Sequence, residues 1–153
     1  MVLLKIGDKA PEFKLKDKEG KVHSLSKSKY KVVYFYPKDN TPGCTIEAKE
    51  FTSDLKEFEK LNIQVIGISG GDEKTKTKFC DKHNLKILLL SDIDFSVSKK
   101  YGVYGKRKFM GIEYLGISRI TYVLDKSNKV IQVYDKVNPK NHSKEVLYFI
   151  QTL

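Results

Sequence analysis

The chain has 153 residues, of which 40% are hydrophobic, enough for one domain with a substantial core. Lysine and arginine number 29 against 19 acidic residues, a formal net charge of +10, but the lysines are spread along the chain without a basic block. We therefore expect a solvated surface and no nucleic-acid-binding face, and no apolar run approaches the ~20 residues that a membrane span needs.

The first residues carry no sign of an export signal. Residues 1–8 contain apolar side chains but no charged leading segment, no longer apolar segment and no small-residue cleavage site. We therefore expect a single domain over residues 1–153, located in the cytoplasm. Two cysteines, Cys44 and Cys80, are too few for a disulfide scaffold, and in that compartment they indicate thiol chemistry or simple packing.

The first half of the chain predicts a hairpin, a strand and a helix. Residues 13–16 and 22–25 flank a turn-like group over 17–20, and the apolar run 32–36 is typical of a strand covered on both faces. From Cys44 onward, apolar side chains recur at steps of four and three residues, which predicts a helix with one buried face. That face would consist of Ala48, Phe51, Leu55 and Phe58.

The second half predicts an alternation of strands and helices. Residues 63–69 read as a buried strand, and Gly70-Gly71-Asp72 as a break that can cap a helix over 73–83. Further expected elements are a strand over 87–90, a short helix over 95–101, a long glycine-containing loop over 102–116, a hairpin of 119–125 and 130–134, and a helix over 142–152. Parallel crossovers followed by antiparallel strands indicate an α/β fold, a thioredoxin-like mixed central sheet flanked by helices.

The stretch Pro37–Glu47 is the strongest candidate for a functional site. It places Cys44 in the first turn of the expected helix, where unpaired backbone N–H groups and the positive end of the helix dipole favour a thiolate over a thiol. It also places the sulfur at the carboxyl edge of the sheet, where open α/β folds hold their sites. We favour this interpretation over a buried cysteine that acts only as a small hydrophobe.

Three neighbours of Cys44 could support it. The Thr41 hydroxyl could point at the sulfur or at an oxygen bound beside it, or Thr41 could be an ordinary turn or capping residue, and the spacing does not choose between these. Pro37 and Pro42 are expected to stiffen the loop and to keep bulk solvent off the sulfur.

Two charged residues are candidates for activating the sulfur. Arg119 begins an otherwise apolar strand in a chain with only two arginines, and we favour a fixed cation for the thiolate and an incoming oxygen over a lid on the sheet edge. Glu47, one turn after Cys44, could orient that arginine, or it could be a helix-start carboxylate.

Cys80 is harder to interpret. It lies next to Phe79 on a separate expected helix, so packing alone would explain it, and a partner thiol for Cys44 is the alternative. With His83 it forms a Cys-x-x-His pair, but two further ligands with suitable spacing are missing, so we expect no metal site.

Taken together, these motifs resemble the peroxiredoxins, specifically the bacterioferritin comigratory protein or peroxiredoxin Q subfamily. The resemblance covers nearly the whole chain, and its most specific part is the Pro-x-x-x-Thr-x-x-Cys core ending at Cys44. The residues that carry it are Gly7–Phe13, Phe35–Ala48, Val65–Ser69, Leu90–Asp92, Lys100–Val103 and Gly116–Asp125.

The resemblance implies a thioredoxin-like fold with an N-terminal hairpin extension. It also implies a peroxidase that reduces hydrogen peroxide and organic hydroperoxides without a cofactor. Such an enzyme receives electrons from thioredoxin or a similar dithiol protein. We expect a monomer or, alternatively, a homodimer. The implied site comprises Cys44 as the peroxidatic cysteine, Thr41 and Pro37 as its motif partners, Arg119 as the activating arginine, and Pro42, Gly43 and Glu47 as supporting residues.

The chain departs from a common version of the subfamily, which carries a resolving cysteine five residues after the first, where this chain has Lys49. Cys80 instead matches the variant with the resolving thiol on the following helix, so the resemblance implies an intramolecular Cys44–Cys80 disulfide. Bridging requires Cα atoms within ~7 Å, so the first turn after Cys44 would have to unwind. Gly70 and Gly71 replace a usual polar pair, and we expect them to loosen the start of the second helix.

Three other functions remain as alternatives. The protein could be a peroxidase that uses one cysteine with an external thiol, a redox sensor that passes its disulfide to another protein, or a basic binding module on the same scaffold.

Overall fold

The computed structural model describes residues 2–153, so that Met1, the first residue of the expected domain, lies outside them. The elements in chain order are β1 (Leu15–Lys16), β2 (Val22–His23), β3 (Tyr30–Phe35), α1 (Pro42–Lys60), β4 (Ile63–Ser69), α2 (Glu73–His83), β5 (Leu88–Ser91), α3 (Ser96–Lys100), β6 (Tyr104–Phe109), β7 (Ile112–Ile117), β8 (Ile120–Leu124), β9 (Val130–Tyr134) and α4 (His142–Gln151).

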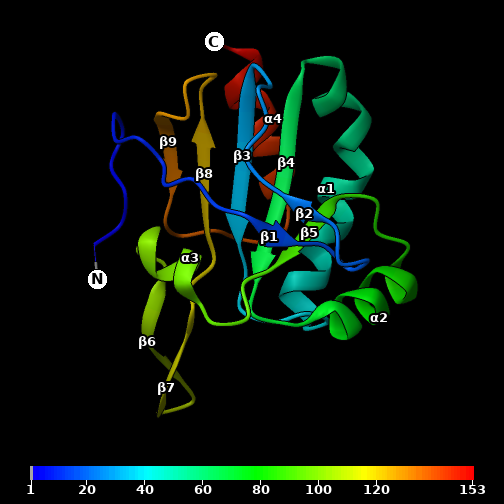
Figure 1. Cartoon of the computed structure of the whole chain (residues 1–153), viewed down its shortest axis with the longest axis vertical. Coiled ribbons are helices and arrows are strands. Elements are labelled where there is room, and N and C mark those ends of the chain that lie inside the picture. Colours follow the sequence, from blue (N-terminus) through cyan, green and yellow to red (C-terminus); the bar gives the residue numbers. More distant parts are fainter. Residues whose placement is uncertain (1) are drawn as a thin grey trace.

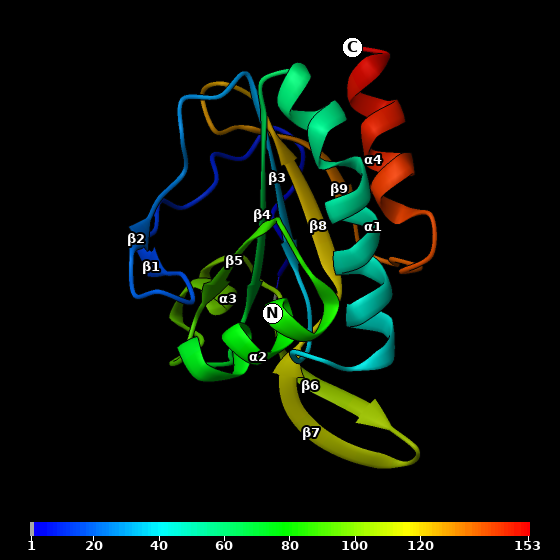
Figure 2. The same cartoon turned by 90° about the vertical axis from the view of Figure 1, so that its right-hand side faces the viewer.

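A mixed seven-stranded sheet forms the centre of the molecule, with strand order β2-β1-β5-β4-β3-β8-β9 (Figure 1). Strands β3, β4 and β5 are parallel, whereas β8 runs antiparallel to β3 and β9 antiparallel to β8. Helices α1 and α4 lie side by side on one face, and α3 lies on the other (Figure 2). The expected thioredoxin-like fold is confirmed, as is the hairpin β1–β2 at its N-terminal side.

The sheet is buried on both faces because β3 alternates between two cores. Val32 and Tyr34, together with Tyr36 directly after the strand, pack with α1, α2 and α4, while Val33 and Phe35 pack with α3 and the N-terminal segment. Successive side chains of a strand point to opposite faces, so a strand covered on both sides reads as the continuous apolar run seen in the sequence. On α1, the expected face is buried at Ala48, Phe51 and Phe58, while Leu55 is half-buried.

The expected long loop over 102–116 is wrong. Residues of this segment form the antiparallel hairpin β6–β7, whose turn residues Met110 and Gly111 both have positive φ, 52° and 81°. Positive φ at both central residues is what a two-residue hairpin turn of type I′ requires. The hairpin projects beyond the main sheet (Figures 1 and 2), and Phe109 and Met110 at its tip are 67% and 86% exposed. Only its base packs on the core, through Tyr104 and Ile117, whereas the residues toward its tip are mostly exposed. The strands therefore show no clear apolar–polar alternation, and the glycines suggested a loop.

The described part of the chain contains neither a helix that could span a membrane nor a cluster of side chains that could bind a metal. Over residues 2–153, no helix is both long enough and apolar enough to span a bilayer. Within those same residues, no three histidine, cysteine, aspartate or glutamate side chains are arranged to hold a metal ion.

Candidate active site

Cys44 is the third residue of α1, which begins at Pro42, two residues before the apolar spacing predicted. Thr41 is the N-cap in extended conformation, and Pro42 occupies the first helical position, where its missing N–H is not needed. The Thr45 N–H makes a 2.8 Å helical hydrogen bond to the Thr41 carbonyl, so the N–H groups of Gly43 and Cys44 precede the helical ladder. Cys44 therefore lies at the positive end of a 19-residue helix, and it is buried, with 1% of its surface exposed.

Arg119 reaches Cys44 because of the pairing between β8 and β3. Ile120 of β8 is the register partner of Phe35, so Arg119 lies beside the end of β3, from which the chain enters the Cys44 loop. Its Nη1 lies 3.5 Å from Cys44 Sγ and donates a 2.9 Å hydrogen bond to Glu47 Oε1. The structure thus brings Cys44, Glu47 and Arg119 together from positions up to 75 residues apart.

The charges in this triad depend on burial. Burial raises the pKa of Glu47 to about 7, and Arg119 opposes that rise only in part. The other oxygen of Glu47, Oε2, is buried without a hydrogen-bond partner among the described residues. For Arg119, burial lowers the pKa, but Cys44 and Glu47 raise it by more, so the net shift is upward. The guanidinium therefore remains a fixed cation beside the sulfur.

Gly43 makes room for this cation. A Cβ atom at Gly43 would lie 2.9 Å from Arg119 Nη2 and 3.4 Å from Pro139 Cγ. The first distance is shorter than ordinary carbon–nitrogen contact, so a larger residue would push the guanidinium away from the first turn of α1. Gly43 belongs to the site because it lacks a side chain.

The Thr41 hydroxyl donates a 3.1 Å hydrogen bond to the Lys38 carbonyl. It makes no hydrogen bond to a backbone N–H of α1 as far as the described residues go, so the capping interpretation of its side chain is wrong. Because its proton is directed at a carbonyl, its oxygen can still accept a hydrogen bond from a bound molecule. The two loop prolines differ in exposure, since Pro37 is half-buried and Pro42 is exposed.

Asp39, in the same loop, is a buried carboxylate that the sequence did not single out. Its Oδ1 accepts hydrogen bonds from the hydroxyls of Tyr36 at 2.6 Å and Ser69 at 3.3 Å. Its Oδ2 accepts from the Thr75 hydroxyl at 2.9 Å and from Lys76 Nζ at 3.3 Å. The loop that carries Cys44 is therefore tied to β4 and to the first turn of α2.

The expectation that Gly70 and Gly71 loosen the start of α2 is corrected by these contacts. Asp72 caps the helix by accepting a 2.9 Å hydrogen bond from the Thr75 N–H. A Cβ atom at Gly71 would clash with Asp39 Oδ2. Gly71 therefore permits the close approach of the Asp39 loop, which holds α2 in place.

Cys80 lies on α2, 5% exposed, in the same apolar cluster as Cys44. Both cysteines are free thiols, and burial raises the pKa of Cys80. Cys80 lines a pocket of about 240 Å³ together with residues of β5 and of the β1–β2 turn. His83 does not join Cys80 in a polar contact, since its Nε2 pairs with Asn40 Oδ1 at 2.8 Å.

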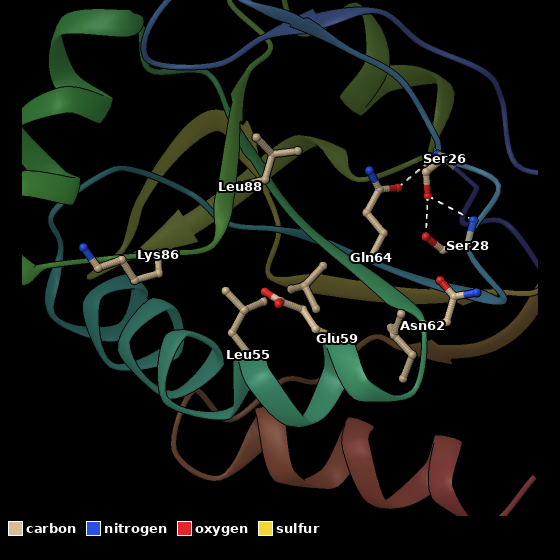
Figure 3. A pocket seen from close by; sticks show the side chains of 10 residues that line it. Ser26, Ser28, Leu55, Glu59, Asn62, Gln64, Lys86 and Leu88 are labelled. Carbon is tan, nitrogen blue, oxygen red and sulfur yellow. Dashed lines mark hydrogen bonds between the residues drawn. The ribbon is translucent and has the colours of Figure 1, made fainter.

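Another pocket, of about 400 Å³, lies away from the cysteines (Figure 3). Leu55 and Glu59 line it from the second half of α1, and Ser26 and Gln64 line it opposite them, joined by a 3.0 Å hydrogen bond. Cys44 lies at the start of the same helix and does not line this pocket. We therefore do not assign the pocket to the candidate site.

One sequence signal could have revealed Lys76. Positions 76, 79, 80 and 83 repeat at helical spacing, so the buried face that carries Phe79 and Cys80 also carries Lys76. A lysine on the apolar face of a helix needs a buried acceptor. Asp39 is that acceptor, but its loop setting gave no sign of burial.

Comparisons with known proteins agree on one family. The AhpC/TSA family profile matches residues 6–133. A putative peroxiredoxin bcp of Helicobacter pylori strain J99 is 42% identical over 149 residues, covering 96% of this chain and 98% of the relative. The peroxiredoxin Bcp of Bacillus subtilis is 40% identical over 152 residues, covering 98% and 97%.

Solved structures give the same result. A cysteine-to-serine mutant of Xylella fastidiosa PrxQ is similar with a TM-score of 0.91 at 29% identity, covering 99% of this chain and 98% of the other. The Xanthomonas campestris bacterioferritin comigratory protein, studied for alkyl peroxide reduction activity, is similar with a TM-score of 0.84 at 31% identity, covering 92% and 90%.

Proposed function

The chain belongs to the AhpC/TSA family and is a peroxiredoxin of the bacterioferritin comigratory protein type, and we propose that Cys44 is the residue that reduces the peroxide. The observation that supports this most is the 3.5 Å contact between Cys44 Sγ and Arg119 Nη1 at the start of α1. The protein is thus a thiol-dependent peroxidase, and hydrogen peroxide and organic hydroperoxides are its proposed substrates.

The reaction at Cys44 is a nucleophilic substitution at oxygen. The thiolate attacks one peroxide oxygen, the O–O bond breaks, and the sulfur becomes a sulfenic acid. The leaving hydroxide or alkoxide takes up a proton and departs as water or alcohol. Arg119 and the free N–H groups of the first turn donate to the oxygen on which charge develops, and Glu47 holds the guanidinium in place.

Thr41 is the proposed acceptor for the peroxide hydroxyl. Its own proton is directed at the Lys38 carbonyl, 3.1 Å away, which leaves lone pairs on Oγ1 available. A peroxide held through its O–H group presents its other oxygen to the sulfur. We assign Pro37 and Pro42 to the shaping of this loop.

Cys80 is the proposed resolving thiol. Its sulfur attacks the sulfenic sulfur of Cys44, an S–S bond forms, the S–O bond breaks and water leaves. The step requires movement, because Cys44 contacts Arg119 beside β8 whereas Cys80 lines a pocket with β5, and β3 and β4 lie between those strands. Thioredoxin or a similar dithiol then restores both thiols, and we propose a monomer acting in the cytoplasm, where such reductants keep cysteines free.

A peroxidase with one active cysteine and an external thiol is the second candidate. The observation that favours it is the burial of Cys80, which raises the pKa of that thiol and makes its thiolate scarce where it lies. The two candidates share the first step and differ in the product that follows it.

Stopped-flow measurement of peroxide consumption tests the first step in the wild type, Cys44→Ser and Cys80→Ser. We expect Cys44→Ser to lose activity and Cys80→Ser to keep the first turnover, and undiminished activity in Cys44→Ser would refute the assignment. Digestion of peroxide-treated protein without reductant, followed by mass spectrometry, tests the second step. A Cys44–Cys80 linked peptide supports resolution by Cys80, whereas sulfinic Cys44 without that peptide supports the external thiol.

A further inference from the structure

A buried ion pair joins the loop that carries Cys44 to the helix that carries Cys80. Lys76 Nζ lies 3.3 Å from Asp39 Oδ2, and the side chains are 0% and 4% exposed. Asp39 lies five residues before Cys44, and Lys76 lies four residues before Cys80, one turn earlier on the same face of α2. Each partner is therefore attached to the segment of one cysteine.

The pair is fully satisfied by neighbours that belong to the same two segments and to the end of β4. Besides Asp39, Lys76 Nζ donates to the Ser69 hydroxyl at 2.7 Å and to the Gly71 carbonyl at 3.0 Å, which uses all three ammonium protons. Asp39 accepts on both oxygens, including the 2.9 Å bond from Thr75 at the start of α2. These partners come together only when the loop and the first turn of α2 are both in place.

Stability alone is a weak explanation for this arrangement. Taking a lysine and an aspartate out of water has a large desolvation penalty, and apolar residues of similar size often stabilise a protein as well or better. Among residues 2–153, the pair also makes no hydrogen bond to Cys44 or Arg119, so the attack on peroxide does not use it. What the pair does is fix the relative position of the two cysteine segments.

On the basis of the Cys44–Cys80 resolution proposed above, we propose that Asp39 and Lys76 are positioning residues whose ion pair must open before the disulfide can form. The sulfenic acid then has two fates. Cys80 can attack it, with release of water, or a second peroxide can transfer an oxygen to the sulfur, forming sulfinic acid and leaving as water or alcohol. Only the first fate needs the segments to move, so the pair controls how the sulfenic acid divides between them.

Lys76→Met tests this role, with Lys31→Met as the matched control. Lys31 is also fully buried, and its Nζ donates to the carbonyls of Asp125 and Lys126 at 3.2 and 3.1 Å, away from both cysteine segments. Each reduced protein is mixed with graded peroxide. Rapid quenching and intact-protein mass spectrometry then give the rate of sulfenic acid formation and the ratio of disulfide to sulfinic acid.

We expect Lys76→Met to form the disulfide about tenfold faster, because the charge-assisted hydrogen bond is lost and Asp39 is left as an unpaired buried charge in the closed arrangement. The sulfinic product should fall correspondingly at each peroxide concentration. The rate of sulfenic acid formation should stay at the wild-type value, and Lys31→Met should match the wild type in both measurements. A role in general stability alone would not change the product ratio selectively.

Thr75→Val provides a milder variant should Lys76→Met fail to fold. It removes the 2.9 Å bond to Asp39 but keeps the ion pair, and we expect disulfide formation to rise about threefold. If the wild type forms the disulfide but the product ratio of these variants equals that of Lys31→Met, or shifts toward sulfinic acid, the role of the pair is refuted. If the wild type itself forms no Cys44–Cys80 disulfide, the resolving role of Cys80 is refuted instead.

Discussion

The burial of Glu47 predicts that the stability of the fold falls as the pH rises toward neutrality. Its carboxyl is buried beside Arg119, and burial raises its pKa from 4.5 to about 7. A carboxyl whose pKa is higher in the folded state binds its proton more tightly there than in the unfolded chain. Its contribution to stability is therefore fully present below about pH 4.5 and is lost as the pH rises through about 7. This is opposite to the behaviour of an exposed, paired carboxylate.

The size of the effect follows from the shift. One pKa unit corresponds to about 1.4 kcal/mol, and integration over the titration gives a loss of about 2.5 kcal/mol between pH 5 and pH 8. Glu47→Gln removes the titration but keeps an oxygen that can accept from Arg119 Nη1, so it imitates the protonated form. We expect the free energy of unfolding of the parent, relative to Glu47→Gln, to fall by that amount over this range.

Urea denaturation at several pH values measures the difference. Both proteins should carry Cys44→Ser, so that the thiol beside Arg119 does not contribute. Glu57→Gln, at an exposed position on the same helix, controls for the loss of one acid. A difference between parent and Glu47→Gln that stays constant from pH 5 to pH 8 would mean that Glu47 is ionised throughout. Burial would then not raise the pKa of Glu47 in the folded protein.

Three further changes test the site itself. Arg119→Lys should lower kcat/KM for peroxide about 100-fold, because Nη1 contacts both the sulfur and Glu47 while Nη2 lies at the first turn, and a single ammonium cannot replace both nitrogens; an unchanged value would contradict the role of the guanidinium. Gly43→Ala should reduce kcat/KM by crowding Arg119 Nη2, and full activity would show that the guanidinium can shift freely. Thr41→Val should lose at least about tenfold in kcat/KM while Thr41→Ser keeps most of it, and equal rates for the two would exclude a role for the hydroxyl.

The elements that the sequence predicted well are those with a buried face and a clear boundary. The bounds of β4 and α2 agree with the predicted 63–69 and 73–83, because an apolar run ends at Gly70 and Asp72 provides the cap of the next helix. The hairpin β6–β7 was missed because most of its side chains beyond the base are exposed, so no clear alternation marks the strands. Its positive φ values at Met110 and Gly111 depend on the turn geometry, which a methionine does not indicate.

The candidate site was predictable where one residue type was rare. Arg119 attracted attention as one of two arginines, and the register between β3 and β8 brings it to Cys44. Lys76 could not be distinguished in this way, because lysines occur throughout the chain. Helical spacing places Lys76 on the buried face of α2, but its pairing with Asp39 is a contact between segments that sequence periodicity does not reveal.

Under the proposed attack by Cys44 and resolution by Cys80, two ion pairs hold the first turn of α1 and its loop in place until Cys44 is released. Glu47–Arg119 fixes the sulfur side of the first turn, and Asp39–Lys76 fixes the preceding loop against α2. Buried pairs of this kind contribute geometry more than net stability, so either can open at modest cost. The rest of α1 is anchored by Ala48, Phe51 and Phe58, whose apolar burial does not depend on the first turn. The loop and first turn can therefore rearrange for resolution while the core of the fold stays intact.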